Sequence, residues 1–270
     1  MLEYGFMQNA FAAAGIVAVV GGLVGYFLVL RGQTFAGHAL GHVGFAGATG
    51  AVLIGVPPFA GLIALSVLAG LGMGLLGERI TERDVAIGIV LALALGFGLL
   101  FLSFYTAFAS EAAALLFGNV LAVDARTVFA LLIISLASLG GLAVISRPLA
   151  FASLAPEVAE ARGVSLRLTS VLFLGIVGLA TAGCAEIVGV LLVFTLMVGP
   201  GATAQRLTGR LGWGLLLAAV LAVAEAWLGI ALAFYTDWPS SFWITALSTL
   251  AYLAAVLVPA HRPAIAERGV

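Results

Sequence analysis

The sequence predicts an all-α, polytopic membrane protein with about nine transmembrane helices, and two observations carry that prediction. The first is composition: 63% of the 270 residues are hydrophobic and only 9% are charged, with a mean hydropathy of +1.25. A soluble domain carries about 25% charged residues, so this chain has too few charges to cover its surface in water. The second is that its apolar residues form long continuous runs, unlike the alternating strands of a membrane β-barrel.

Nine apolar stretches are candidate membrane spans. A helix needs about 20 apolar residues to cross the hydrocarbon core of a bilayer, and each stretch approaches that length between charges, prolines or glycine clusters. In chain order we expect spans at Phe11–Leu30, Thr34–Val56, Phe59–Leu76, Val85–Tyr105, Thr127–Ile145, Leu168–Ala185, Val188–Ala204, Trp213–Phe234 and Phe242–Val258. No basic segment precedes the first span, so we do not expect it to be a cleaved signal peptide.

The arginines predict the orientation, because cytoplasmic loops of membrane proteins are enriched in basic residues. Threading nine spans places Arg126 alone on one side of the membrane. The other ten arginines fall on the opposite side: Arg31, Arg79, Arg83, Arg147, Arg162, Arg167, Arg206, Arg210, Arg262 and Arg268. We therefore expect a multi-pass protein of the cell (inner) membrane, with its N-terminus outside and its C-terminus in the cytoplasm.

Composition also excludes several classes of function. The chain has one cysteine, which rules out a disulfide scaffold or a structural zinc module. Its net charge of −1 does not suit nucleic-acid binding. It lacks H-E-x-x-H, G-x-S-x-G and paired aspartates within spans, which argues against an intramembrane protease.

Glycines are abundant, and three pairs have the G-x-x-x-G spacing that lets helix backbones approach closely. The pairs are Gly21/Gly25, Gly37/Gly41 and Gly70/Gly74. At 35 glycines, such spacings also arise by chance. We expect a compact bundle in which some of these glycines lie at helix contacts.

The longest expected cytoplasmic connection, Arg147–Arg167, contains a short helix of its own at about 155–163. Pro156 suits the first position of a helix, Glu157 and Ala161 suit its body, and Gly163 suits its end. A helix of about two turns is not stable alone in water, so either the membrane domain or a partner should hold it. Its acids argue against a helix resting on the bilayer surface, because such helices favour Lys and Arg.

These residues resemble a known family. The segment P-E-x-A-x-A-x-G-V is similar to the coupling helix of ATP-binding-cassette importers. The whole chain resembles, almost end to end, the permease subunits of the class of these importers that takes up zinc, manganese and iron. The other matching motifs are L-V-L-R at Leu28–Arg31, T-F-A-G-H-A-L-G-H at Thr34–His42, A-I-G-I at Ala86–Ile89, L-L-F-G-N-V-L-A-V at Leu115–Val123 and G-V-L-L-V-F-T-L-M-V-G-P-G-A-T-A at Gly189–Ala204.

The resemblance implies a single permease domain over residues 1–270 that works in a larger assembly. Two copies of the permease pair around a translocation path within membrane lipid, two ATPase subunits grip the coupling helices at Pro156, Glu157, Ala161 and Gly163, and an extracytoplasmic binding protein delivers the metal. The chain has no lysine and hence no Walker A motif, so ATP belongs to a separate ATPase. No covalently bound cofactor is expected; the divalent metal is cargo.

His38 and His42 are the first candidate metal ligands, because an ionisable group within a span is costly and suggests function. Four residues apart on a helix, they share one face, and neutral imidazole suits zinc and other late transition metals. The family usually has aspartate at the first position and histidine at the second, so His42 matches and His38 departs. The two-histidine face favours zinc over manganese; the alternative is a hydrogen-bonded histidine pair at a helix contact.

Three further positions are candidates with plain structural alternatives. Glu111 sits where the family commonly has aspartate, and Asn119 where it has another acid, at an outer mouth that would attract cations; both are otherwise ordinary loop residues. Pro200, between Gly199 and Gly201, is a possible gating hinge or an inert kink. Glu225, near the middle of the eighth span, is either a path residue or a buried protonated acid.

The sequence thus predicts the membrane-spanning subunit of an ATP-driven divalent metal importer, with zinc favoured and manganese or iron possible. A stand-alone secondary metal-ion transporter or channel is the main alternative, and it would need neither a coupling helix nor an ATPase. A structural membrane scaffold would leave the histidines and the acidic cytoplasmic helix unexplained.

Overall fold

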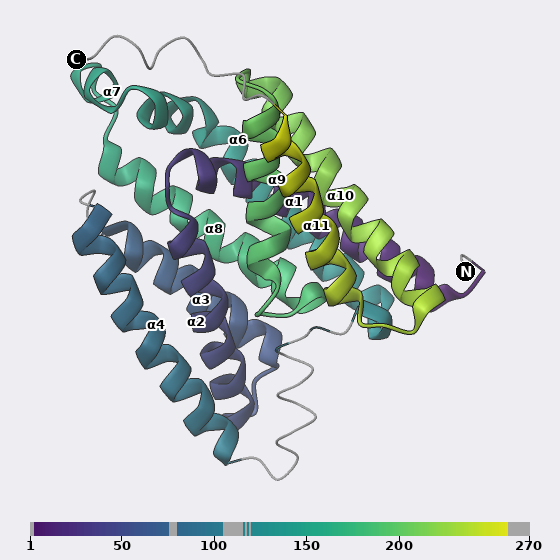
Figure 1. The fold of residues 1–270 in the computed structure, drawn as a ribbon. Coiled ribbons are helices and arrows are strands. Elements are labelled where there is room, and N and C mark those ends of the chain that lie inside the picture. The colour runs from purple at the N-terminus through teal and green to yellow at the C-terminus, as the bar shows by residue number, and fades with distance from the viewer. Residues whose placement is uncertain (1–2, 76–79, 105–115, 117, 119, 259–270) are drawn as a thin grey trace.

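The computed structural model describes residues 3–75, 80–104, 116, 118 and 120–258, and every regular element in those ranges is helical (Figure 1). The predicted all-α fold class is confirmed. The elements are α1 (Gly5–Leu30), α2 (Thr34–Leu53), α3 (Pro58–Leu75), α4 (Ile80–Ser103), the 3-10 helix η1 (Val120–Ala122), α6 (Ala125–Leu154), α7 (Pro156–Ala161), α8 (Leu166–Val188), α9 (Val193–Leu207), α10 (Leu211–Thr236) and α11 (Ser240–Leu257).

A long helix coincides with each expected span, but the helices differ in how well they suit lipid. Seven of those the structure describes are long and apolar enough to cross a membrane. The two outside that set are α2 and α9. At 15 residues, α9 is about 22 Å long, shorter than the roughly 30 Å hydrocarbon core. Much of α2 is buried within the bundle, where polarity is tolerated because it faces protein.

The helices form two groups joined by a central pair (Figure 1). One group contains α2, α3 and α4, with α2 packed between the other two. The other contains α1, α9, α10 and α11. Helix α8 lies between the groups and packs against α3, α1 and α2, while α6 packs against α8 and α1. The core therefore runs along α1, α2 and α8, which are the helices with the most buried residues.

The predicted glycine pairs lie at close helix contacts. A Cβ at Gly25 would overlap the carbonyl of Met197 on α9, and one at Gly70 would overlap the carbonyl of Leu174 on α8. At Gly41, a Cβ would lie 3.3 Å from the carbonyl oxygen of Val190. Backbones that approach this closely leave no room for a side chain, which explains why these helices carry glycine there.

Capping residues set the beginnings of α6 and α8. The backbone N–H of Thr127 donates to Asp124 Oδ1 at 2.8 Å, and that of Leu168 donates to Ser165 Oγ at 3.2 Å. Each bond satisfies a donor that the first turn of a helix leaves free. Helix α6 also continues to Leu154, beyond the expected span end at Ile145 and through Pro148, so the cytoplasmic connection is shorter than predicted.

The seventh expected span begins with a turn. The chain leaves the helical path between Val188 and Val193, and Pro200 lies inside the α9 that follows. Gly189 there has φ of +86°, a backbone conformation that favours glycine. The backbone N–H of Leu191 donates to the carbonyl of Leu116, which ties this turn to the segment before η1.

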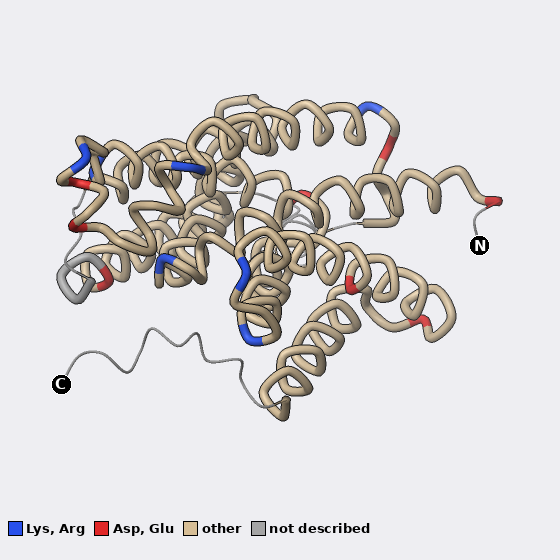
Figure 2. The backbone as a smooth tube through the Cα atoms, turned by 90° about the horizontal axis from the view of Figure 1, so that it is seen from above, with Lys and Arg blue, Asp and Glu red and all other residues tan. Residues whose placement is uncertain are grey.

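Charges segregate along the bundle (Figure 2). Most blue segments, the arginines, lie in the half away from the N-terminus, whereas acids also occur near the N-terminal end. This arrangement agrees with the arginine distribution that predicts the cytoplasmic side. The orientation itself stays a prediction, and below we call the end with the N-terminus the outer end.

Candidate functional site

Helix α2 brings His38 and His42 together. Their ring centroids lie 4.8 Å apart at an interplanar angle of 81°, as expected for residues one turn apart on one helix face. His42 is only 7% exposed, and its Nδ1 has no hydrogen-bond partner among the described residues. His38 is half-buried. A buried ring nitrogen without a partner is costly, and it can serve as a metal ligand because its lone pair is not used by a hydrogen bond.

The histidine pair lies where α2 meets α9. The ring of Phe194, in the first turn of α9, packs edge-to-face on His38 with centroids 5.3 Å apart. Gly41 lies beside Val190 and Val193 without a side chain of its own. The glycine in α2 therefore allows the start of α9 to approach and to form one wall of the site.

A groove begins next to this wall. Phe194 also lines a groove of about 340 Å³ between α9 and α11, together with Gly199, Ser248 and Tyr252. The histidines themselves do not line the groove. One aromatic ring thus contacts both the histidine pair and an open surface of the bundle.

A single copy offers a small set of metal ligands. Within the described residues, no group of three or more His, Cys, Asp or Glu side chains is placed to hold a metal ion. Protein zinc sites use three or four protein ligands. The pair is therefore two ligands of an incomplete set, and further donors must come from water, from another chain or from cargo-bound groups.

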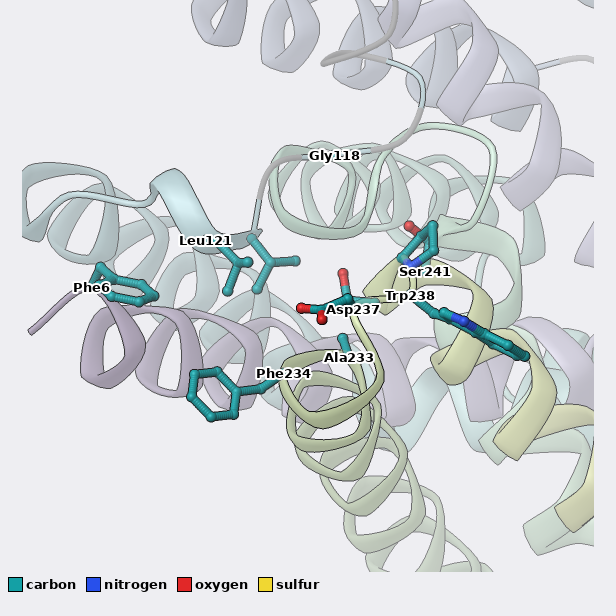
Figure 3. A pocket seen from close by; sticks show the side chains of 11 residues that line it. Phe6, Gly118, Leu121, Ala233, Phe234, Asp237, Trp238 and Ser241 are labelled. Carbon is teal, nitrogen blue, oxygen red and sulfur yellow. The ribbon is translucent and has the colours of Figure 1, made fainter. Parts of the chain in front are cut away.

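The other predicted metal ligand, Glu111, lies outside the described residues, as does Asn119. The neighbouring positions Gly118, Val120 and Leu121 line a cavity of about 690 Å³ at the outer end, closed on its other side by the loop between α10 and α11 (Figure 3). Figure 3 shows Asp237 between Leu121 and Phe234. Asp237 is an exposed acid with φ of 57°.

Sequence reasoning missed Asp237 as a residue of the outer mouth. The signal was present, because the loop T-D-W-P joins two expected spans on the predicted outer side. Trp238 and Trp243 stack there with centroids 5.6 Å apart, and the indole N–H of Trp243 donates to the hydroxyl of Thr236 at 2.9 Å. These contacts order the loop that presents Asp237.

Glu225 is a second buried ionisable group, separate from the histidines. It is 4% exposed in the middle of α10, and neither carboxyl oxygen has a hydrogen-bond partner among the described residues. Its polar neighbour is the hydroxyl of Ser248 on α11. Ser248 in turn lies against Gly199 of α9. Glu225 therefore faces a junction of three helices, with Ser248 between it and the α9–α11 groove.

The predicted hinge at Pro200 is closely packed. Pro200 is buried, and a Cβ at the adjacent Gly201 would lie 2.8 Å from the backbone nitrogen of Tyr26 on α1. The proline removes one helix hydrogen bond, and α1 packs against the segment from the side. A hinge role stays a prediction.

The predicted cytoplasmic helix is present as α7, between α6 and α8 at the end far from the N-terminus (Figure 1). Pro156 occupies its first turn, and Pro156, Glu157, Ala161 and Gly163 are all exposed. Ala159 is fully buried and the guanidinium of Arg162 lies 6.0 Å from the ring centroid of Phe151 on α6. Gly163 has φ of +83°, which turns the chain into α8. The membrane domain thus holds one face of α7 and leaves its acidic face free.

The family is decided by comparison with known proteins. The profile of the ABC 3 transport family matches residues 3–259. The chain belongs to the ABC 3 transport family. With its apolar helices, it is a multi-pass protein of the cell membrane.

Individual relatives in this family match part of their own length. The "Manganese transport system membrane protein MntC" of Listeria innocua is 31% identical over 134 residues, which is 49% of this chain and 48% of that protein. The "Probable iron transport system membrane protein" of Haemophilus influenzae is 37% identical over 127 residues, 46% of this chain and 45% of that protein. The matches to these curated relatives thus span about half of their length.

The fold is shared with a solved structure. PsaBC from Streptococcus pneumoniae, in complex with Fab, superposes with a TM-score of 0.85 over 95% of this chain and 93% of that chain, at 24% identity. At that identity the likeness establishes the fold of this ABC 3 family chain.

Proposed function

We propose that this chain is the membrane-spanning subunit of an ATP-driven importer of a divalent transition metal, in which His38 and His42 contact the cargo. The observation that carries the proposal is the pair of adjacent imidazoles on a buried helix, one with a ring nitrogen that no described residue hydrogen-bonds. Membership of a transport family supports this reading, as do the relatives named for manganese and iron transport.

Two copies of the permease form the path in this proposal. One copy supplies two imidazoles, which is too few to hold a metal. A second copy facing the first would supply two more, and the set of four would suit zinc or another late transition metal. Transient binding by nitrogen ligands from both copies also lets the metal leave when the copies separate.

A separate ATPase supplies the energy, and α7 is its contact. The helix is too short to be stable alone, and the bundle holds it through Ala159 while Glu157 and Ala161 stay exposed. A stand-alone transporter or channel has no use for an anchored helix with a free acidic face. The geometry of α7 therefore favours the importer over that alternative.

The outer end receives the metal from an extracytoplasmic binding protein in this proposal. The cavity beside η1 and the α10–α11 loop lies at the predicted outer end and carries the carboxylate of Asp237. Carboxylates at a mouth raise the local concentration of cations. Glu111, on the same connection as η1, is proposed to add to this effect.

Zinc is the favoured cargo on local chemistry, and manganese and iron are the competitors that the relatives suggest. Manganese prefers oxygen ligands, whereas imidazole suits zinc and iron. The absence of a carboxylate at position 38 therefore lowers the expected preference for manganese.

Co-purification with a candidate ATP-binding-cassette ATPase tests the proposal, followed by metal uptake into vesicles that contain the complex. We expect the native chain to retain the ATPase. Glu157→Arg should not retain the ATPase because the exposed charge is reversed. Gly163→Pro should not retain it either, because proline cannot adopt a φ of +83°. Asp124→Asn, at the opposite end of the bundle, is the matched control and should retain it. A native chain that binds no ATPase, or takes up metal without ATP, would instead establish the stand-alone transporter.

A further inference from the structure

Arg31 occupies the junction between the histidine helix and the helices that carry α7. It caps the C-terminus of α1, and the connection to α2 consists of Arg31, Gly32 and Gln33. The Nε–H of Arg31 donates to Gln33 Oε1 at 3.3 Å, and an Nη1–H donates to Ser153 Oγ at 3.4 Å. The guanidinium also lies 5.8 Å from the ring centroid of Phe173 on α8.

Gln33 extends the contact to α8. It is only 3% exposed, and its Nε2–H donates to the hydroxyl of Ser170 at 3.5 Å. Each of these hydrogen bonds is long, so no single one is strong. Two of them are donated by the guanidinium, which also lies over an aromatic ring, and the third links its partner Gln33 to α8.

The two ends of this network are the two functional regions of the proposed importer. Gln33 immediately precedes α2, and His38 and His42 follow within the first nine residues of that helix. Ser153 is in the last turn of α6, separated from the first residue of α7 by Leu154 and Ala155. Phe173 and Ser170 belong to the early turns of α8, the helix that follows α7.

The chemistry of arginine suits a connection of this kind. Its planar guanidinium presents several N–H donors in fixed directions, so it can bond to two elements at once. Lysine carries the same charge as a single flexible ammonium and cannot reproduce that fork. If Arg31 served only as a cytoplasmic charge that orients the protein, lysine would replace it without loss.

We propose that Arg31 is a positioning residue that transmits the displacement of α7 to the start of α2, and so couples ATP hydrolysis to the state of the histidine pair. The proposal rests on the proposed function. When the ATPase moves α7, the end of α6 and the start of α8 move with it. The hydrogen bonds of Arg31 and Gln33 then move the first turn of α2 in the same direction. The histidines then change their position relative to Phe194 and the facing copy.

The test measures ATP hydrolysed per metal ion imported by the full complex, with its ATPase and binding protein, in vesicles supplied with zinc. For Arg31→Gln and Arg31→Lys we expect the ratio to rise about fivefold or more, the size of a typical coupling between sites. Uptake should fall while ATP hydrolysis and ATPase co-purification persist. Arg206→Gln is the matched control, because Arg206 is an exposed arginine in the last turn of α9, and it should keep the native ratio.

A second variant keeps the test decisive if the arginine variants do not assemble. Ser153→Ala with Ser170→Ala removes the acceptors on α6 and α8 and keeps the charge of Arg31, and it should raise the ratio in the same direction. A native ratio in all assembled variants would overturn the coupling role, and so would uptake and hydrolysis that fall in equal proportion. A native complex with no ATP-dependent uptake would overturn the proposed function instead.

Discussion

The histidine pair on α2 and the glutamate on α10 are two buried ionisable sites that the sequence makes look alike. Both lie within apolar helices, and both have polar atoms without a hydrogen-bond partner among the described residues. They differ in what surrounds them. His42 has a second imidazole 4.8 Å away, on His38. Glu225 has a neighbouring hydroxyl, that of Ser248, which is a weaker ligand. Each site lies one side chain from the same groove, through Phe194 beside His38 and through Ser248 beside Glu225. A buried ionisable group therefore indicates a metal site only when a second good ligand lies beside it.

Removing a ligand from the first site should have the largest effect. His42→Ala is expected to reduce metal uptake by about 100-fold, because loss of even an outer partner of a metal ligand costs about 10- to 100-fold in affinity. The measurement is uptake into vesicles containing the full complex, with thermal stability as the check on folding. Thr49→Ala, which removes a buried hydroxyl bonded within the same helix at 3.0 Å, should retain uptake. Normal uptake by folded His42→Ala protein would show that the histidine pair, like Glu225, is not a metal site.

Changing the chemistry of the first site should shift selectivity. His38→Asp restores an oxygen ligand beside His42, and carboxylate favours harder cations such as manganese. We expect the preference for zinc over manganese to fall about tenfold, which corresponds to about 1.4 kcal/mol. Competition between the two metals in the uptake assay measures it. An unchanged preference would show that position 38 does not contact cargo.

Substituting Glu225 should change the stability of the protein and leave transport nearly unchanged. Glu225→Leu keeps a similar volume and removes two buried oxygens that have no hydrogen-bond partner in the described part of the chain, each a cost of about 1–3 kcal/mol. We expect a more stable protein by at least about 1 kcal/mol, measured by thermal unfolding in detergent. Ser248→Ala, the paired control, should change stability less. Loss of uptake in a stabilised Glu225→Leu protein would make Glu225 a path residue after all.

The smallest expected effect concerns Asp124, an exposed acid that serves as a comparison for the two buried sites. Hydrogen bonds from the hydroxyl of Thr127 and, next, from its backbone N–H lower the pKa of the Asp124 carboxyl below its usual range. A lowered pKa in the folded state means that the charge stabilises the protein above the unfolded pKa. That stabilisation is lost as pH falls through the folded pKa.

Asparagine caps a helix without titrating. Asp124→Asn should therefore lose slightly less thermal stability than the native chain between about pH 6 and about pH 3. An identical pH profile in the two proteins would mean that the cap contributes nothing.

The helices were predictable because each depends on a local property of the chain. Continuous apolar runs predicted the long helices, and Pro156 with Gly163 predicted α7 to within about two residues of its bounds. The glycine pairs were predictable as helix contacts because the spacing places both members on one face. Capping by Asp124 and Ser165 is also a local signal.

The sites were only partly predictable because they depend on contacts between distant segments. The spacing of His38 and His42 predicted their adjacency, but Phe194 comes from another helix. Pro200 lies inside α9, and the packing of α1 against its flank is a contact that no local pattern indicates. Ser153, which accepts a hydrogen bond from Arg31, lies 122 residues away on α6, and no local pattern indicates this contact.

The contacts of α1 with α9 and α10 also bear on how the bundle can move. Gly25 meets the carbonyl of Met197, Gly201 meets the backbone of Tyr26, and Gly22 meets the carbonyl of Ala218, in each case with no room for a Cβ. Helices that contact one another through side chains can slide when those side chains change rotamer. Helices in direct backbone contact have no such freedom. We therefore expect α1, α9 and α10 to travel as one rigid block during transport, while relative motion is confined to contacts packed through side chains, such as that between α2 and α4.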